Sequence, residues 1–251
     1  MRLKKLVSII ITSYNEEKNI ASVIKDCQKL KKFFPIEIVV VDGGSKDKTV
    51  EVVKKLKVDK IVPFLFKRGK GADFWAGGIA ANGDYIVQID ADHQFQPNEI
   101  PLFVEALDKG ADVAIATRFT GDGKIEKGSI SSRNLFGNWL MSFLTSMAAG
   151  RKITDVMAGF KAFKKDAFLA LDLKERHFEY EAEAVVKSIK MGMNLVQIPI
   201  TYTKRKGGES GIRAIRDGLN VSKAIVKVYL ADLPSISSLR SNSNKKSKQI
   251  R

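Results

Sequence analysis

The stretch IEIVVVDGGS, residues 36–45, decides the fold class: a mostly β-branched run ends in an aspartate followed by a glycine turn. No polar residue interrupts it between Ile38 and Val41. Such a run is typical of a strand buried on both faces, as in a parallel sheet. A second apolar run, residues 6–12, precedes it, and the residues between the two runs have helical spacing. The start of the chain therefore predicts an α/β protein.

Strand-like and helix-like ranges continue to alternate up to about residue 120. The expected strands are 6–12, 36–42, 61–66, 85–90 and 112–117, and the expected helices are 16–34, 47–56, 71–82 and 97–109. Repeated units of this kind predict a doubly wound, mostly parallel sheet. Pro63 places the third strand at an edge or a bulge, because proline cannot donate to a strand ladder.

The second half of the sequence is less regular. Its expected elements are an apolar-rich helix 133–149, a helix 178–191, a strand 195–203, a basic glycine-rich loop 204–211 and an amphipathic helix 212–231. In the last helix Arg213, Arg216, Lys223 and Lys227 share one face, and Ile215, Leu219, Val226 and Leu230 line another.

Composition narrows the classes of function. The 251 residues carry 43 Lys and Arg against 28 Asp and Glu, a net charge of +15, so we expect an anionic partner: nucleic acid, a phosphorylated substrate or a membrane surface. Cys27 is the only cysteine, which excludes internal disulfides and indicates a reducing, cytosolic setting. Because the sequence has no run of about 18 apolar residues, we expect no membrane-spanning helix.

Two of the expected strands end in an aspartate, at the sheet edge where ligands bind in such folds. Asp90 and Asp92 are two apart, so both can face one cation, and Gln94 continues the alternation with a neutral oxygen. Oxygen ligands favour Mg²⁺ or Mn²⁺ shared with substrate phosphates; the alternative is that one aspartate only caps the next helix. Asp42 either accepts hydrogen bonds from a base or ribose or belongs to a glycine turn capped by Ser45 or Asp47.

Together these blocks resemble glycosyltransferase family 2, which has the GT-A fold. The resemblance rests on TSYNEE 12–17, VDGGS 41–45, Thr49, GKGA 69–72, GDYI 83–86, DADHQ 90–94 and Pro97. Up to about residue 215 the chain is further similar to the polyprenyl-phosphate sugar synthases, whose type is dolichyl-phosphate mannose synthase. That similarity rests on TRF 117–119, SRN 132–134, Asp155, GFK 159–161, Glu183, Pro199-Ile200, Arg205 and GES 208–210. Two positions depart: Gly211 replaces a usual lysine, and Gly43 stands where many relatives have a second aspartate.

The resemblance implies a metal-dependent, inverting transfer of one hexose from a UDP- or GDP-linked sugar to a polyprenyl phosphate such as dolichyl phosphate, in protein glycosylation. The implied metal ligands are Asp90, Asp92 and Gln94, with Mg²⁺ or Mn²⁺, and the implied catalytic residues are Asp92, Arg118, Arg133 and Arg205. The implied donor-binding residues are Thr12, Tyr14, Glu16, Asp42, Lys70, Asp90, Ala91, Asp155 and Gly159, with Phe160 also shaping the sugar pocket. The implied acceptor-phosphate ligands are Arg118, Arg133, Arg205 and Ser210, and Arg213 is a candidate substitute for the missing lysine.

The chemistry of the acceptor separates the remaining hypotheses. A phosphate acceptor is already ionised and needs cations, whereas a saccharide or protein hydroxyl needs a general base. For that alternative the candidate bases are Glu179, Glu181 and Glu183, while His93 is interpreted as a local hydrogen-bonding residue. A nucleic-acid-binding module would explain the charge but not the aspartates, so we expect no nucleic-acid partner. Neither the base of the donor nor the hexose is specified.

A polyprenyl acceptor requires contact with a bilayer. We expect a catalytic domain over 1–211, a basic amphipathic helix over 212–233 and a basic flexible tail over 234–251. The helix and tail suit peripheral attachment to the cytoplasmic face of a membrane. The alternative is that the apolar stripe packs on the domain and the tail only adds solubility. Residues 134–149 are predicted to line an acceptor groove or to belong to the core.

Overall fold

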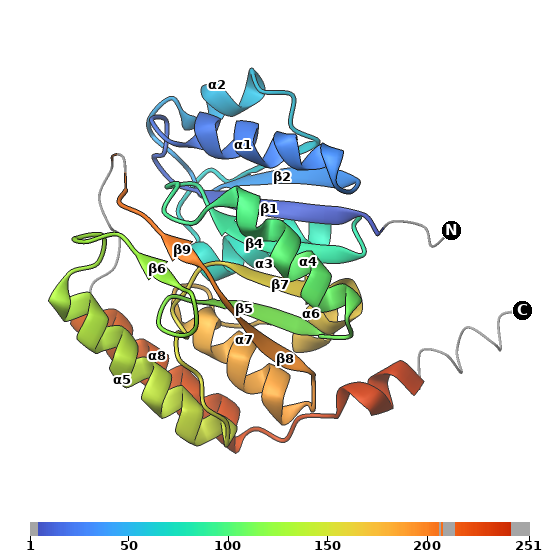
Figure 1. Ribbon diagram of the computed structural model, residues 1–251, viewed down its shortest axis with the longest axis vertical. Helices are drawn as coiled ribbons and strands as arrows, with labels where there is room; N and C mark the ends of the chain where they lie inside the picture. The colour runs from blue at the N-terminus through green and yellow to red at the C-terminus, as the bar shows by residue number, and fades with distance from the viewer. Residues whose placement is uncertain (1–4, 206, 208–213, 242–251) are drawn as a thin grey trace, which may run out of the picture.

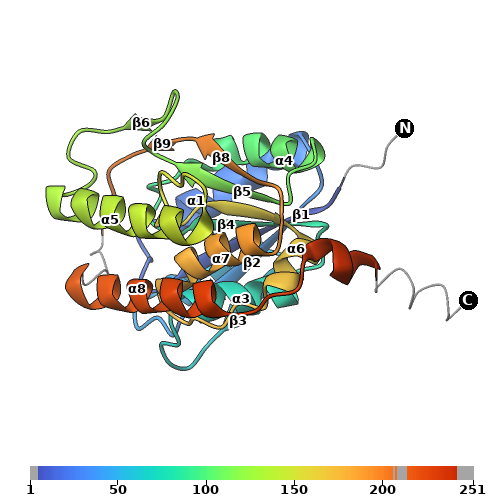
Figure 2. The same ribbon diagram turned by 90° about the horizontal axis from the view of Figure 1, so that it is seen from below.

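The computed structural model describes residues 5–205, 207 and 214–241, and within them a seven-stranded sheet has helices on both faces (Figures 1 and 2). The strands are β1 (Val7–Ser13), β2 (Ile36–Asp42), β3 (Lys60–Pro63), β4 (Tyr85–Asp90), β5 (Val113–Thr117), β7 (Lys161–Lys164) and β8 (Leu195–Pro199). Their order is β3-β2-β1-β4-β7-β5-β8, and β7 runs antiparallel to both neighbours while every other pair is parallel. The doubly wound, mostly parallel sheet of a GT-A fold is thus confirmed.

Helices cover the two faces of the sheet and enclose two buried clusters. They are α1 (Ile20–Gln28), α2 (Thr49–Lys54), α3 (Lys70–Ala80), α4 (Ile100–Asp108), α5 (Ser132–Ala149), α6 (Lys165–Leu171), α7 (Glu179–Lys190) and α8 (Ala214–Leu230). Adjacent residues of one strand feed opposite faces: Ile9 joins the cluster under α1 and α4, and Ile10 joins the cluster under α3, α6 and α7. Because side chains alternate along a strand, the unbroken apolar runs supply both cores.

Four elements differ from the sequence-based expectation. β7 and α6 were not predicted; β7 is only four residues long and its pattern carries little periodicity. The expected helix 16–34 begins only at Ile20, because residues 16–19 form a turn. The expected strand 195–203 is divided into β8 and β9 (Thr201–Tyr202), and β9 pairs with β6 (Lys124–Ile125). The placement of Pro63 on an edge strand is confirmed.

The C-terminal residues pack against the rest of the domain up to a later position than the sequence suggested. α8 lies against α5 and α7 through the buried Val221, Ile225 and Val228. Residues 236–241 are helical, and Arg240, expected in a flexible tail, pairs with Asp112 at 2.9 Å. The packed chain therefore extends to 241. In the described ranges, no helix combines the length and the apolar character needed to cross a bilayer.

Candidate active site

One cavity of about 1090 Å³ opens at the carboxyl ends of β1 and β4 and extends to α5 and α8. Most of the site residues predicted from the sequence line it. These are Thr12, Tyr14, Glu16, Lys70, Asp90, Ala91, Asp92, Gln94, Arg118, Arg133, Gly159 and Arg205. Asp42 and Asp155 do not line the cavity, and Ser210, Gly211 and Arg213 lie outside the described residues. The sheet thus brings together side chains up to 193 positions apart, from Thr12 to Arg205.

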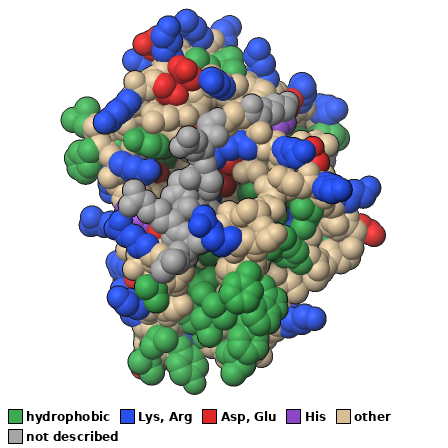
Figure 3. Space-filling view, turned by 90° about the vertical axis from the view of Figure 1, so that its left-hand side faces the viewer, with side chains coloured by type: hydrophobic (Ala, Val, Ile, Leu, Met, Phe, Trp, Pro, Cys, Tyr) green, Lys and Arg blue, Asp and Glu red, His purple; other side chains and the backbone are tan. Residues whose placement is uncertain are grey.

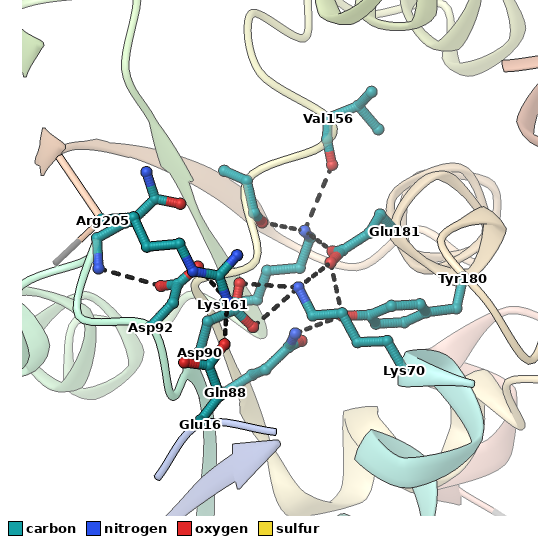
Figure 4. Close-up of polar contacts among 12 residues, drawn as sticks. Glu16, Lys70, Gln88, Asp90, Asp92, Val156, Lys161, Tyr180, Glu181 and Arg205 are labelled. Atoms are coloured by element: carbon teal, nitrogen blue, oxygen red, sulfur yellow. Dashed lines mark hydrogen bonds and ion pairs between the residues drawn. The ribbon is translucent and has the colours of Figure 1, made fainter. Parts of the chain in front are cut away.

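Two aspartates form the acidic end of the cavity: Asp90, the last residue of β4, and Asp92, two residues later (Figure 4). Burial raises the pKa of Asp90, Lys70 lowers it and the neighbouring Asp92 raises it, and together these effects bring it to about 6. Burial also raises the pKa of Asp92, which lies 3.8 Å from Arg205. Arg205 in turn contacts Glu16. Two buried carboxylates that resist ionisation favour a bound cation, because its charge offsets their desolvation.

The oxygens present fit a hard divalent cation that is only partly held by protein. Asp92 accepts a hydrogen bond from the Gln94 backbone at 3.1 Å, and the Gln94 side-chain amide donates to the Thr203 carbonyl at 3.3 Å. No group of three or more His, Cys, Asp or Glu side chains within the described part of the chain could hold a metal alone. Mg²⁺ and Mn²⁺ sites commonly complete their coordination with water and substrate phosphate oxygens.

Beneath these aspartates lies a network of buried charges that the sequence did not reveal. Lys70 lies 2.9 Å from Asp90 and 3.3 Å from Glu181. The other oxygen of Glu181 contacts Lys161, whose amino group also donates to the Ala158 carbonyl at 2.5 Å. Although burial opposes it, Lys161 and Lys70 hold the pKa of Glu181 below its ordinary value. The one available signal was a lysine between apolar residues in GFKAF, residues 159–163.

Gly159 makes this arrangement possible. A Cβ at this position would lie 2.4 Å from both the Asp90 carboxylate and the Lys70 amino group. Real Cβ atoms do not approach other atoms so closely, so a side chain here would displace the Lys70–Asp90 pair. The predicted place of Gly159 at the site is therefore explained by close packing against charged groups.

The carboxylates considered as general bases are held in the protein interior. Glu181 is paired with two lysines, and Glu183 accepts hydrogen bonds from the backbone of Lys174 at 3.0 Å and pairs with Lys187 at 2.7 Å. Glu179 is 7% exposed, and none of the three glutamates lines the cavity. His93, interpreted as a local hydrogen-bonding residue, contacts Asp26 at 3.0 Å. These four side chains do not provide a base at the cavity wall.

Three predicted contacts have a different role in the structure. Asp155 is fully buried and binds Arg118 through two bonds of 2.6 and 2.7 Å, so it orients this arginine. Phe160 is also buried and stacks on Phe103. Asp42 accepts hydrogen bonds from the Ser45 backbone at 2.9 Å and hydroxyl at 2.5 Å, which matches the glycine-turn interpretation. Sequence spacing cannot show which aspartates point inward.

The other end of the cavity is apolar and lies between α5 and α8. Its wall includes Phe136, Leu140, Met141 and Leu219, close in sequence to Arg133. Residues 134–149 were predicted either to line an acceptor groove or to belong to the core. In the structure α5 contributes to the cavity wall and to the core, because Met141 is buried while Phe136 is 64% exposed. Figure 3 shows hydrophobic side chains gathered over the lower part of this face, where Figure 1 places α5 and α8.

Comparison with known proteins agrees with this geometry. Residues 8–171 match the model of glycosyl transferase family 2. A dolichol-phosphate mannosyltransferase of Pyrococcus furiosus is 30% identical over 210 residues, covering 82% of this chain and 59% of the relative. The polyprenol monophosphomannose synthase of Mycolicibacterium smegmatis is 28% identical over 232 residues, covering 88% and 84% respectively.

Solved structures support the fold. Glucosyl-3-phosphoglycerate synthase of Mycobacterium tuberculosis, crystallised with Mn²⁺, UDP and glucosyl-3-phosphoglycerate, superposes with a TM-score of 0.64 at 19% identity. The match covers 90% of this chain and 79% of that chain. The family match over residues 8–171 and the 30% identical relative show that the chain is a glycosyltransferase and belongs to glycosyltransferase family 2.

Proposed function

We propose that the protein transfers one hexose from a UDP- or GDP-linked sugar to a polyprenyl phosphate, with Mg²⁺ or Mn²⁺, at the cytoplasmic face of a membrane. One observation carries the proposal: a single cavity joins a charged end, with Asp90, Asp92 and Arg205, to an apolar end between α5 and α8. A nucleotide-sugar diphosphate with a cation suits the first end. A phosphate attached to a long hydrocarbon suits the second.

The divalent cation would be held by Asp90 and Asp92, with Gln94 nearby, and would neutralise charge on the leaving diphosphate. Lys70 lies next to Asp90 and adds a fixed positive charge at this end. Arg133 is exposed and lines the cavity beside the apolar wall, where it can bind the acceptor phosphate. Arg118, held by Asp155, presents its guanidinium from a fixed position.

None of Glu179, Glu181, Glu183 and His93, the side chains considered as bases for a hydroxyl acceptor, lines the cavity, although Asp73 and His177 do, and a phosphate acceptor needs no base. An acceptor hydroxyl must lose a proton, whereas an ionised phosphate oxygen attacks without that step. Relatives named as dolichyl- or polyprenyl-phosphate transferases support the same choice. One of them, from Methanococcus voltae, is named as transferring N-acetylglucosamine from a UDP donor.

Contact with the membrane is proposed through the outer faces of α5 and α8. Trp139 is 60% exposed and stacks between Phe136 and Phe143, at centroid distances of 5.9 and 6.0 Å. On α8 the predicted apolar stripe, Leu219, Val226 and Leu230, is exposed and a different face packs inward. Aromatic and aliphatic side chains on one surface, in a chain of charge +15, suit an anionic bilayer interface.

The test is transfer of radiolabelled sugar into lipid that an organic solvent extracts. The purified protein receives dolichyl phosphate, Mn²⁺ and a panel of UDP- and GDP-sugars. We expect label in the lipid phase with one donor, lost with Asp92→Ala or with a chelator and retained with Asp122→Ala, a substitution of an exposed aspartate outside the cavity. Metal-dependent hydrolysis of a donor without lipid label would overturn the acceptor and favour a hydroxyl substrate.

A further inference from the structure

Asp73 is a buried carboxylate that the proposed mechanism does not use. It lies in the first turn of α3, is 6% exposed and lines the cavity. Within the residues described, its Oδ1 atom has no hydrogen-bond partner. A buried carboxylate oxygen without a partner is costly for the folded protein. Such a group at a cavity wall indicates that a ligand supplies the missing hydrogen bond.

The position of Asp73 depends on Gly43. A Cβ placed on Gly43 would lie 2.7 Å from Asp73 Oδ2 and 3.4 Å from the Ser13 carbonyl oxygen. The carboxylate therefore lies over the ends of β1 and β2, in space that a side chain at position 43 would occupy. With glycine at position 43, the Asp73 carboxylate from α3 occupies this space, while the Asp42 carboxylate accepts hydrogen bonds from Ser45.

The groups around Asp73 allow its carboxylate to ionise, although none of them forms an ion pair with it in the described residues. Burial raises the pKa of Asp73 to about 6, and Asp42 adds to this, while Arg68 and Lys67 act in the opposite direction. Both cations stack on aromatic rings: Lys67 lies 4.1 Å from the centre of the Tyr14 ring, and Arg68 lies 4.2 Å from that of Phe64. Near neutral pH the carboxylate is therefore mostly ionised and accepts hydrogen bonds.

The chemistry of this carboxylate restricts what it can bind. An ionised carboxylate repels phosphate but accepts hydrogen bonds from hydroxyl or N–H groups. Asp73 is three residues after Lys70 on α3, so both side chains lie on one helix face, and Lys70 reaches Asp90 at the proposed diphosphate site. The nucleoside of a nucleotide sugar carries neutral hydroxyl and N–H groups that can donate a hydrogen bond, and it would lie about one helical turn from the diphosphate.

We propose that Asp73 binds the nucleoside of the donor by accepting a hydrogen bond from a ribose hydroxyl or a base N–H. The proposal rests on the nucleotide-sugar donor proposed above. It assigns to α3 a contact that the sequence-based expectation had assigned to Asp42, and it gives the Gly43 departure a structural meaning.

The test is calorimetric binding of UDP and GDP in Mn²⁺ to the wild-type chain and to Asp73→Asn and Asp73→Ala. We expect about tenfold or greater loss of affinity for the preferred nucleotide in Asp73→Ala, the cost of one charge-assisted hydrogen bond, and a smaller loss in Asp73→Asn, whose amide oxygen still accepts a hydrogen bond. Pyrophosphate in Mn²⁺ should bind all three proteins equally, because it lacks the nucleoside. Circular dichroism confirms that each variant is folded.

Nucleotide analogues identify the contacted group without altering the protein. If a ribose hydroxyl is the hydrogen-bond donor, a 2′- or 3′-deoxynucleotide should bind the wild type about tenfold more weakly than the parent nucleotide does, whereas Asp73→Ala, which lacks an acceptor, should bind both nucleotides alike. If a base N–H is the donor, the N-methylated base shows this pattern instead. Equal sensitivity of wild type and variant to every analogue overturns the proposal.

A transplanted carboxylate provides a second test. In Gly43→Asp with Asp73→Ala, the crowding atom is gone, so we expect nucleotide affinity to recover toward the wild-type value. Nucleotide binding that is equal in wild type and both Asp73 variants overturns the role of Asp73 but keeps the proposed donor. A wild-type chain that binds neither nucleotide overturns the donor itself, and this role with it.

Discussion

The two ends of the cavity are stabilised in opposite ways. Beneath the charged end, the proposed donor end, charged side chains are removed from water: Lys161 is 0% exposed and Glu181 1%. Around the apolar end, the proposed acceptor end, apolar side chains are left in water: Phe136, which lines the cavity, is 64% exposed, and Trp139, which stacks on it, is 60% exposed. Ion pairs hold the charged side chains of the first end together. The second gains its stabilisation only when a partner covers it.

The largest expected effect breaks the donor end. Lys161→Met leaves Glu181 with only Lys70 as a counter-charge, and loss of one partner of a buried ion pair costs about 3–5 kcal/mol of unfolding free energy. Urea unfolding measures the loss. The control is Lys109→Met, which removes a 73% exposed lysine of a surface pair and should change stability by less than about 0.5 kcal/mol. Similar effects of the two substitutions would contradict the description of the donor end.

The second effect breaks the acceptor end while sparing the donor end. Trp139→Ser with Phe143→Ser removes two exposed aromatic rings, each worth about 1.5–3 kcal/mol when buried in a bilayer interface. Sedimentation with anionic vesicles should show binding weakened about a hundredfold or more. Leu102→Ser, which replaces a 46% exposed leucine on α4, should bind vesicles as the wild type does. If UDP or GDP affinity falls as well, the two ends are not separable.

The smallest expected effect is the pH dependence of stability caused by Asp73. This carboxylate lies at the charged end of the cavity but, unlike Glu181, has no ion-pair partner among the described residues. The folded-state pKa of Asp73, about 6, is above its ordinary value of 3.8. Between these values the folded chain binds more protons than the unfolded chain, so this residue lowers unfolding free energy as pH rises. We expect Asp73→Asn to be more stable relative to wild type at pH 8 than at pH 4, by about 1–3 kcal/mol.

Urea unfolding of both proteins at the two pH values measures this difference, and taking it between wild type and variant removes the contribution of Asp90, which titrates in the same range. Arg68, Lys67 and Asp42 are the charged groups that act on Asp73. An unchanged difference between pH 4 and pH 8 would show that Asp73 is paired or well solvated.

The sequence predicted the residues that line the charged end of the cavity better than the buried elements beneath them. The strands before Thr12, Asp42 and Asp90 are long apolar runs, so their ends, and the polar residues that follow, could be placed from periodicity. β7 is short and antiparallel, and it inserts between β4 and β5 although it follows both in sequence. No local pattern encodes such an insertion, so the pairing of Lys161 with Glu181 could not be foreseen.

Aspartates show the same limit most clearly. The sequence alone does not distinguish the roles of five aspartates. The family resemblance assigned site roles to Asp42, Asp90, Asp92 and Asp155 but not to Asp73. The structure instead engages Asp42 in a turn and Asp155 with Arg118, and it leaves Asp73 at the cavity wall with an unpaired oxygen. Direction and partners of a side chain depend on contacts between distant elements.

By itself, the sequence determined the α/β class, the edge of the sheet where the site lies, the Asp90–Asp92 pair and the excess of positive charge. These follow from local periodicity and composition, which need no knowledge of long-range contacts. Only the tertiary structure decided which charges are buried together, which face of α8 packs inward and which carboxylate lies above Gly43. Each of these depends on the packing of elements remote in sequence, where burial fixes whether a charged group is paired or available to a ligand.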